Sequence, residues 1–337
     1  MAKDLTESLH DRQNILNNRY ALQKAEQHLA LGGVQFDGET VFTKQQGIER
    51  FDISDATVER YLSSHGDELK ANGYTLLRGA KLKQFKEIAV GTLISEGTKT
   101  TVLGIFTFRA ILNLGMLLTD SERAKELRSR VLDIVIDVLA ERAGGHTKFI
   151  NQRDQDYLMA AFQEENYRKK INDALDKYVD GNKWKYGRFT NLIYQSIFHE
   201  NATEYKKILK LAEKDKIRET MYSEVLTLIA SFESGIAHEL ERQSISLGRP
   251  LTQKEAELLF ASFEQHPLFK PLILDARTKM ASRDLCFRDA LHEKLEAYIK
   301  SVPEADFERF LGEKSKSLED QLSDPETLEV FKRLKDR

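Results

Sequence analysis

Glycine and proline are scarce in this chain, and their scarcity limits the folds that it can adopt. The 337 residues include 5 prolines and 18 glycines, which favours long helices over a strand-rich fold. After Gly145 the apolar residues recur at helical spacing along most of the chain. A chain of this length usually forms about two domains. We therefore predict a mostly α protein in which residues 146–337 form an all-α domain for assembly, sensing or partner binding.

Capping residues and helix-stopping residues divide this C-terminal region into separate predicted helices. Gly248 and Pro250 end one helix, and Thr252 with Glu255 has the spacing of a capping box at the start of the next. The predicted helices are Gln152–Val179, Thr190–Phe198, Ala202–Leu211, Asp215–Leu247, Thr252–Glu264, Leu272–Lys300, Pro303–Leu311 and Pro325–Lys335.

The preceding region, residues 33–145, is predicted to form an α+β module that follows a helical arm, residues 1–32. Asp37 and Gly38 lie between two short alternating apolar runs, which is a strong signal for a β-hairpin. Another strand-like run covers Thr100–Phe106. Gly144 and Gly145 mark the predicted boundary with the all-α domain.

Two short helices are predicted directly after the hairpin. The first begins at about Lys44 and ends near Phe51, and the second covers about Asp55–His65, with Ser54 or Asp55 as its cap. Two short helices joined by a three-residue turn form the helix-turn-helix pattern, whose second helix enters the major groove of DNA. The sequence therefore predicts a winged helix-turn-helix-like DNA-binding module.

The same region carries a resemblance to a known group of DNA-binding domains. Its first part covers Val41–Phe51, Ser54–Leu62 and Asp67–Tyr74, and its second part covers Ile105–Leu112 and the helix Ala124–Leu139. These segments resemble RhuM-type virulence proteins and the related phage and viral Bro, ANT and KilA-N families. The resemblance implies a bacterial or phage-related DNA-binding protein, a transcriptional regulator linked to mobile elements or phage defence.

Candidate DNA contacts lie on the second helix and in a basic segment that follows it. Base contacts are expected from hydroxyl and guanidinium groups on the helix. Phosphate contacts are expected from Leu69–Lys86, which contains five basic residues and no acid, and in which Tyr74–Phe85 is predicted to be a wing-like strand and loop. The candidate DNA-binding residues are Lys44, Ser54, Thr57, Arg60, Ser64, Lys70, Arg78, Lys81, Lys83 and Lys86.

Charge over the whole chain does not favour nucleic acid. The formal net charge is -3, and Asp55 and Glu59 on the second helix would repel phosphate groups. Double-stranded DNA is therefore expected to bind through the local basic patch alone. A homo-oligomer is also expected, because helix-turn-helix modules usually bind paired half-sites as dimers.

A charged cluster in the predicted helix Leu272–Lys300 is the second candidate site. It consists of Arg283, Asp284, Arg288 and His292, the last three at four-residue spacing, so that they would neighbour one another on one helix face. One interpretation is a ladder of intrahelical ion pairs, and the other is a general acid–base or phosphodiester-binding cluster.

The second interpretation of this cluster leads to an alternative function. The protein would then be a defence effector or a toxin–antitoxin component, whose helical domain has RNase-like activity or neutralises a partner protein. Arg288 and His292 lie closer together in sequence than the corresponding pair of HEPN nucleases, so that nuclease pattern is not matched.

An aromatic-basic cluster surrounds the sole tryptophan. Trp184 lies beside Lys183, Lys185, Tyr186 and Arg188 in a segment predicted to be a loop. Such a cluster can stack on a nucleobase or anchor a partner protein, and it can equally be a packed loop tip.

The sequence predicts no catalytic residue, metal site or cofactor. It contains no phosphate loop, dinucleotide fingerprint or paired-histidine zinc motif. Cys286 is the single cysteine, which excludes an intramolecular disulfide and fits a reducing cytoplasm. The longest apolar stretch, Val102–Leu118, is too short to span a membrane, and the N-terminal residues lack the apolar core of a signal peptide. A cytoplasmic protein without membrane association is expected.

Overall fold

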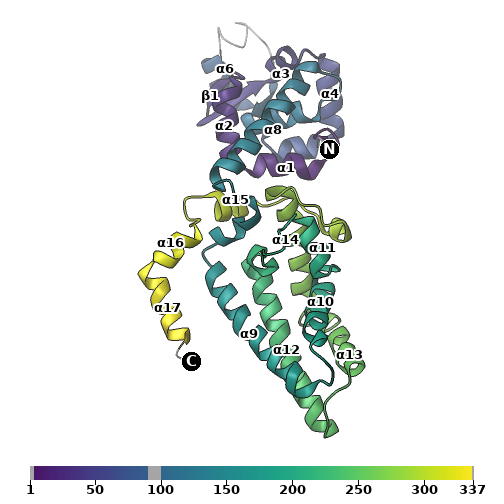
Figure 1. Cartoon of the computed structure of the whole chain (residues 1–337). Helices are drawn as coiled ribbons and strands as arrows, with labels where there is room; N and C mark the ends of the chain where they lie inside the picture. Colours follow the sequence, from purple (N-terminus) through teal and green to yellow (C-terminus); the bar gives the residue numbers. More distant parts are fainter. Residues whose placement is uncertain (1–3, 90–99, 336–337) are drawn as a thin grey trace. The chain divides into compact units, whose positions relative to one another are not determined.

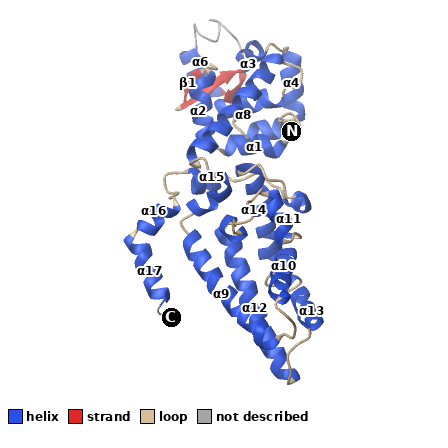
Figure 2. Ribbon diagram, in the orientation of Figure 1, coloured by secondary structure: helices blue, strands red, loops and turns tan. Residues whose placement is uncertain are grey.

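The computed structural model describes residues 4–89 and 100–335, and it divides into two compact units, Met1–Val138 and Leu139–Arg337. The division lies within helix α8 (Glu122–Arg142), whereas the sequence placed the boundary at Gly145. Helices dominate both units, as predicted. Within the described residues all the named strands belong to unit 1, where they form a small sheet (Figure 2).

The sheet of unit 1 is antiparallel and has the strand order β1-β2-β4-β3. The predicted hairpin is confirmed: Val34 pairs with Val41, and both Asp37 and Gly38 have the positive φ angles that the tight turn requires. The predicted strand near residues 100–106 is confirmed as β4. The strands are β1 (Val34–Phe36), β2 (Glu39–Thr43), β3 (Tyr74–Arg78) and β4 (Val102–Thr107).

Helices pack on both faces of this sheet, because successive strand residues point to opposite sides. On one face, Phe42 and Phe106 belong to the main core of the unit, which most of its helices share. On the other face, Val41 and Ile105 pack with a smaller core supplied by α6. The remaining helices are α1 (Leu9–Asn17), α2 (Arg19–Leu29), α3 (Lys44–Phe51), α4 (Asp55–Ser64), α5 (Gly66–Ala71), α6 (Gly79–Ala89) and α7 (Phe108–Leu117).

The N-terminal residues do not form a separate arm, so that prediction is wrong. The predicted single helix is broken at Asn18, whose side chain caps α2 by accepting a hydrogen bond from the Ala21 amide at 3.1 Å. The break lets α1 and α2 bury different faces in the main core of unit 1. Leu5 and Leu16 are almost completely buried there.

Unit 2 is helical, and its longest helices, α9 and α12, pack against each other side by side (Figure 1). Its elements are three short 3-10 segments and nine α-helices within the described residues: η1 (Thr147–Arg153), α9 (Tyr157–Tyr178), α10 (Trp184–Phe198), α11 (Ala202–Ile208), η2 (Ile217–Thr220), α12 (Ser223–Leu247), α13 (Gln253–Glu264), α14 (Lys270–Phe287), η3 (Glu293–Tyr298), α15 (Glu304–Leu311), α16 (Leu318–Ser323) and α17 (Pro325–Lys335).

Several predicted helix boundaries in unit 2 are wrong. The helix predicted over Asp215–Leu247 begins only at Ser223, after η2. The helix predicted over Leu272–Lys300 ends at Phe287, because the chain turns at Asp289 with a φ of 51°. Trp184 does not lie in a loop, since α10 begins at that residue.

Candidate nucleic-acid interface and a buried charge network

Helices α3 and α4 are held in a fixed geometry by their caps. Thr43 and Gln46 form a capping box at the start of α3, and Asp52 ends that helix in the left-handed conformation. The Ser54 hydroxyl then caps α4 by accepting a hydrogen bond from the Thr57 amide at 3.1 Å. Phe51 and Val58 anchor the pair in the main core. The outer side of α4 is thereby presented to solvent.

Two acids on α4, Asp55 and Glu59, share one lysine from α3 as their partner. The Lys44 ammonium lies 2.8 Å from an Asp55 carboxylate oxygen and 2.7 Å from a Glu59 carboxylate oxygen. Partial burial lowers the pKa of Lys44, but these bonds outweigh it and raise the pKa above its ordinary value. Lys44 therefore acts as the partner of the two acids, and its charge offsets one of their two negative charges.

Arg60 is the most available of the predicted contacts on α4. Its side chain is 62% exposed and lies 3.7 Å from the exposed carboxylate of Asp120, which is a weak surface pairing. The hydroxyls of Ser54 and Thr57 instead bond to each other at 2.9 Å, and Ser64 donates to the backbone carbonyl of Arg60. Arg60 can therefore exchange its partner for a DNA base edge or phosphate at low cost.

The basic segment Leu69–Lys86 has a different structure from the predicted wing. It contains the end of α5, strand β3 and then helix α6 in place of a loop. Leu82 and Phe85 bury one side of α6 against the sheet face opposite to the one that contacts α3 and α4. The basic residues of α6 and those of the α3–α4 pair therefore lie on opposite faces of the sheet.

The basic side chains of this segment differ in their availability. Arg78, Lys81 and Lys83 are exposed, although the Lys81 ammonium lies 3.1 Å from Asp37. Lys86 is half-buried and donates to the carbonyl of Thr100, and the Lys70 ammonium lies 3.8 Å from Asp67.

In unit 2, Asp284, Arg288 and His292 form a buried cluster, in which Arg288 and Asp284 make one ion pair at four-residue spacing. The side chains of all three are at most 1% exposed. His292 lies beyond the end of α14, and its ring nitrogens lie 2.7 Å from an Asp284 oxygen and 2.8 Å from a Glu200 oxygen. Arg288 donates to the carbonyl of Thr220 at 2.7 Å.

His292 is held as an imidazolium between two carboxylates. Burial lowers its pKa, but the bonds to Asp284 and Glu200 outweigh this and raise the pKa to about 9. Both ring nitrogens are engaged, and the residue has no exposed side-chain surface. Because a general acid or base must reach a substrate proton, this geometry suits a structural role. The acid–base interpretation of the cluster therefore has no geometric support at His292.

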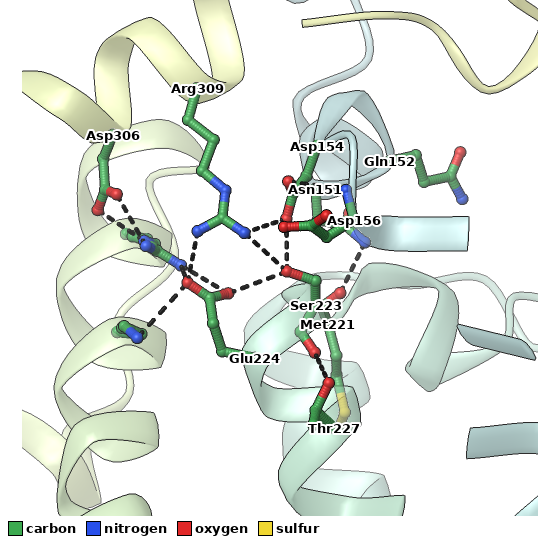
Figure 3. A network of polar contacts seen from close by, with 12 residues as sticks. Asn151, Gln152, Asp154, Asp156, Met221, Ser223, Glu224, Thr227, Asp306 and Arg309 are labelled. Atoms are coloured by element: carbon green, nitrogen blue, oxygen red, sulfur yellow. Dashed lines mark hydrogen bonds and ion pairs between the residues drawn. The ribbon is translucent and has the colours of Figure 1, made fainter. Parts of the chain in front are cut away.

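Arg283 points away from His292 into a second polar network. Its guanidinium makes two hydrogen bonds of 2.8 Å with the carboxylate of Asp306 and a third, of 3.0 Å, with Glu224. Arg309 joins Glu224 to Asp154 and to the Ser223 hydroxyl, as Figure 3 shows. The network thus links the loop that precedes α9 with helices α12, α14 and α15.

The acid at the centre of this network stays ionised. Burial raises the pKa of Glu224, but Arg283, Arg309 and Lys279 together lower it to about 2. The sequence analysis did not identify the residues that complete the networks around Arg283 and His292. These residues, Glu200, Glu224, Asp306 and Arg309, lie in other helices or loops and form no motif along the chain. The only sequence signal was the unusual density of charge near residues 283–292.

The aromatic-basic cluster around Trp184 is not assembled as one site. Trp184 is 82% exposed at the first turn of α10. Lys185 is buried and donates to the Val179 carbonyl at 2.9 Å, while Arg188 pairs with Glu257 of α13. The two cations thus hold α10 in place. Cys286, the single cysteine, is partly exposed.

Within residues 4–89 and 100–335, no group of three or more His, Cys, Asp or Glu residues could hold a metal ion. No helix in this same part of the chain has the length and apolar character needed to cross a membrane. A scan against models of protein families finds no match, and a search of curated proteins finds no matching relative.

Proposed function

We propose that unit 1 binds double-stranded DNA through a helix-turn-helix formed by α3 and α4. In this proposal α4 enters the major groove, and the protein is a homo-oligomeric transcriptional regulator of bacterial or phage origin, linked to mobile elements or phage defence. The resemblance of residues 41–74 and 105–139 to RhuM, Bro, ANT and KilA-N proteins is the basis for the proposed bacterial or phage origin and for the proposed link to mobile elements or phage defence. Unit 2 then serves assembly, sensing or partner binding.

One observation carries the proposal. The capped three-residue turn Asp52–Ser54 presents α4 with Arg60 exposed, while Lys44 from the neighbouring helix pairs with Asp55 and Glu59 and offsets one of their two negative charges. An arginine on an exposed helix can form bidentate hydrogen bonds with guanine in the major groove. The pairing of both acids with one lysine reduces their repulsion of a phosphate backbone close to this helix.

The residues that suggested the RNase-like alternative are buried and already have protein partners. Arg288 and His292 bind backbone and carboxylate groups inside unit 2, and neither side chain reaches the surface. Replacing these residues would disturb the folding of unit 2, so loss of an activity after such a change would not identify a catalytic site. We therefore place the DNA-binding proposal ahead of this alternative.

The proposal is tested by selecting bound duplexes from a random DNA library with the full chain. We expect one enriched sequence, and Arg60→Ala should lose about 1–3 kcal/mol of discrimination between that sequence and a scrambled duplex. Arg130→Ala, which removes an exposed arginine from α8, is the matched control and should keep the discrimination. The absence of any enriched sequence, or full discrimination by Arg60→Ala, would overturn the proposal.

A further inference from the structure

A cavity of about 490 Å³ lies between three helices of unit 2. Its lining comes from α9, α12 and α14, with Arg309 of α15 also contributing. The volume falls within the range of small-molecule binding sites in proteins, about 300–1,000 Å³. Met159, Leu228 and Leu272 supply apolar surface. The cavity can therefore accept the apolar part of a small ligand.

Most charged groups of the lining already have protein partners. Arg309 bonds to Glu224 and Asp154, as Figure 3 shows, and the Lys279 ammonium lies 2.6 Å from Asp275 and 3.5 Å from Glu224. These pairs compensate one another and hold the walls in place. They leave neither cation as an open site for an anionic ligand.

Asp156 is the exception among these charged groups. It occupies the N-cap position of α9, where an aspartate usually accepts a hydrogen bond from the first turn, yet its side chain makes no capping bond. Within the described residues, no side chain pairs with its carboxylate, which lines the cavity. Asp275 pairs with Lys279, and Glu224 pairs with Arg283 and Arg309. Asp156, whose side chain is exposed, is therefore the acid of this lining without a cationic partner among the described residues.

The neutral polar groups of the lining also favour a hydrogen-bond donor. The hydroxyls of Thr227 and Ser231 donate to backbone carbonyls one turn earlier in α12. Each hydroxyl oxygen keeps lone pairs for a further donor. A protonated amine has three N–H donors and a positive charge, so it complements both these oxygens and the Asp156 carboxylate.

A neighbouring hollow restricts the length of such a ligand. It shares Gln163, Thr227 and Ser231 with the first cavity and continues along α9 and α12. Glu165, Lys169 and Lys170 line this second part, and the Lys169 ammonium lies 3.6 Å from Glu165. The two lysines and one acid leave a net positive charge, which is unfavourable for the second ammonium of a long diamine that extended into this part. A ligand with one positive charge fits better.

We propose that this cavity binds a small organic monocation, whose ammonium group pairs with Asp156 and whose apolar chain lies against Met159, Leu228 and Leu272. The proposal rests on unit 2 alone and is independent of DNA binding by unit 1. It assigns to the helical unit the recognition of a primary amine, a role that suits a sensing domain.

Calorimetric titration of the full chain with four matched compounds tests the charge preference. The compounds are hexylamine, hexanoate, hexanol and 1,6-diaminohexane, at a pH where both amines are protonated. We expect hexylamine to bind more tightly than hexanol by about tenfold, the contribution of one charge-assisted contact. The diamine should bind more weakly than hexylamine, and hexanoate should not bind. Equal binding of hexylamine and hexanoate, or no binding of hexylamine, would overturn the proposal.

Three variants locate the binding in this cavity. Asp156→Asn should weaken hexylamine binding about tenfold, to the level of hexanol. Ser231→Leu places a larger side chain in the cavity and should abolish binding. Asp173→Asn removes an exposed acid elsewhere on α9 and should leave binding unchanged. Thermal unfolding of each variant checks that unit 2 remains folded. Unchanged binding by folded Asp156→Asn would contradict the proposal.

Discussion

The protonation of one residue, His292, makes the stability of unit 2 dependent on pH. Its imidazolium compensates two buried carboxylates, Asp284 and Glu200, and without the proton these charges would lose their shared partner. Burial of uncompensated charge is expensive in a protein interior. The residue that the sequence marked as a candidate acid–base group is therefore best explained as a buried counter-ion.

The stability of unit 2 should fall as pH rises from about 6.5 to about 9. The folded-state pKa of His292, about 9, lies above its ordinary value of 6.5, so its contribution is complete below 6.5 and is lost as pH rises through 9. The difference corresponds to about 3 kcal/mol. Urea unfolding at several pH values measures this slope.

Two histidine variants give the control for that measurement. His292→Gln should flatten the slope between pH 6.5 and 9, and it should also lower stability at pH 6.5 because the buried carboxylates lose their cation. His238→Gln replaces an exposed histidine of α12 and should keep the wild-type slope. Parallel pH profiles for wild type and His292→Gln would contradict the assigned role.

At the scale of elements, close packing explains why glycines occur inside two helices of unit 1. A Cβ at Gly115 of α7 would lie only 2.3 Å from Leu127 and 2.9 Å from the Phe51 ring, so α8 and α3 approach this helix closely. A Cβ at Gly47 of α3 would lie 3.2 Å from the end of the Ile111 side chain, which can move. The glycine that costs helix propensity at position 47 thus permits close contact between α3 and α7.

Gly115→Ala should therefore destabilise unit 1 more than Gly47→Ala does. Both changes improve helix propensity by about 1 kcal/mol, so the difference between them measures the steric cost alone. We expect that difference to be about 1–3 kcal/mol, the usual cost of overpacking a core. Denaturant unfolding of the two variants checks it, and a Gly115→Ala protein as stable as Gly47→Ala would show that these helices are not packed as described.

Elements specified by neighbouring residues were predictable, and elements specified by distant partners were not. The hairpin at Asp37–Gly38 and the cap of α4 depend on local backbone geometry; the hairpin was predicted correctly, and Ser54 is one of the two caps predicted for α4. Helix α14 ends where the chain turns at Asp289, and Arg288 beside this turn binds the carbonyl of Thr220, far away in sequence. Helical periodicity continues past that point, so the pattern alone extended the helix to Lys300. For the same reason, the sequence pattern did not place Glu224 and Arg309 in the candidate site, because their partners are distant in sequence.

At the scale of the whole molecule, the two groups of candidate DNA contacts lie on opposite faces of the sheet of unit 1. Arg60 belongs to the α3–α4 side, and Lys81 and Lys83 belong to α6 on the other side. The sequence analysis assigned both groups to one DNA-binding module, in which a wing-like strand and loop follows the helix pair. The folded unit therefore requires that their roles be tested separately.

The α6 lysines should contribute to affinity without contributing to sequence discrimination. If they contact phosphates, Lys81→Ala with Lys83→Ala should weaken binding to all duplexes and reduce the slope of log affinity against log salt by about 2. Binding to the selected and scrambled duplexes at several salt concentrations measures both quantities. An unchanged slope would restrict the DNA interface to the α3–α4 side.

The central claim is that unit 1 recognises specific DNA sequences, and genome-wide sequencing of DNA recovered with the tagged protein tests it most directly. The control is Arg60→Ala, with a thermal unfolding profile matched to the wild type. We predict a few sharp peaks, including one at the protein's own promoter, that are lost in the control. No enrichment over the control would contradict the account and leave α3 and α4 with a structural or protein-binding role.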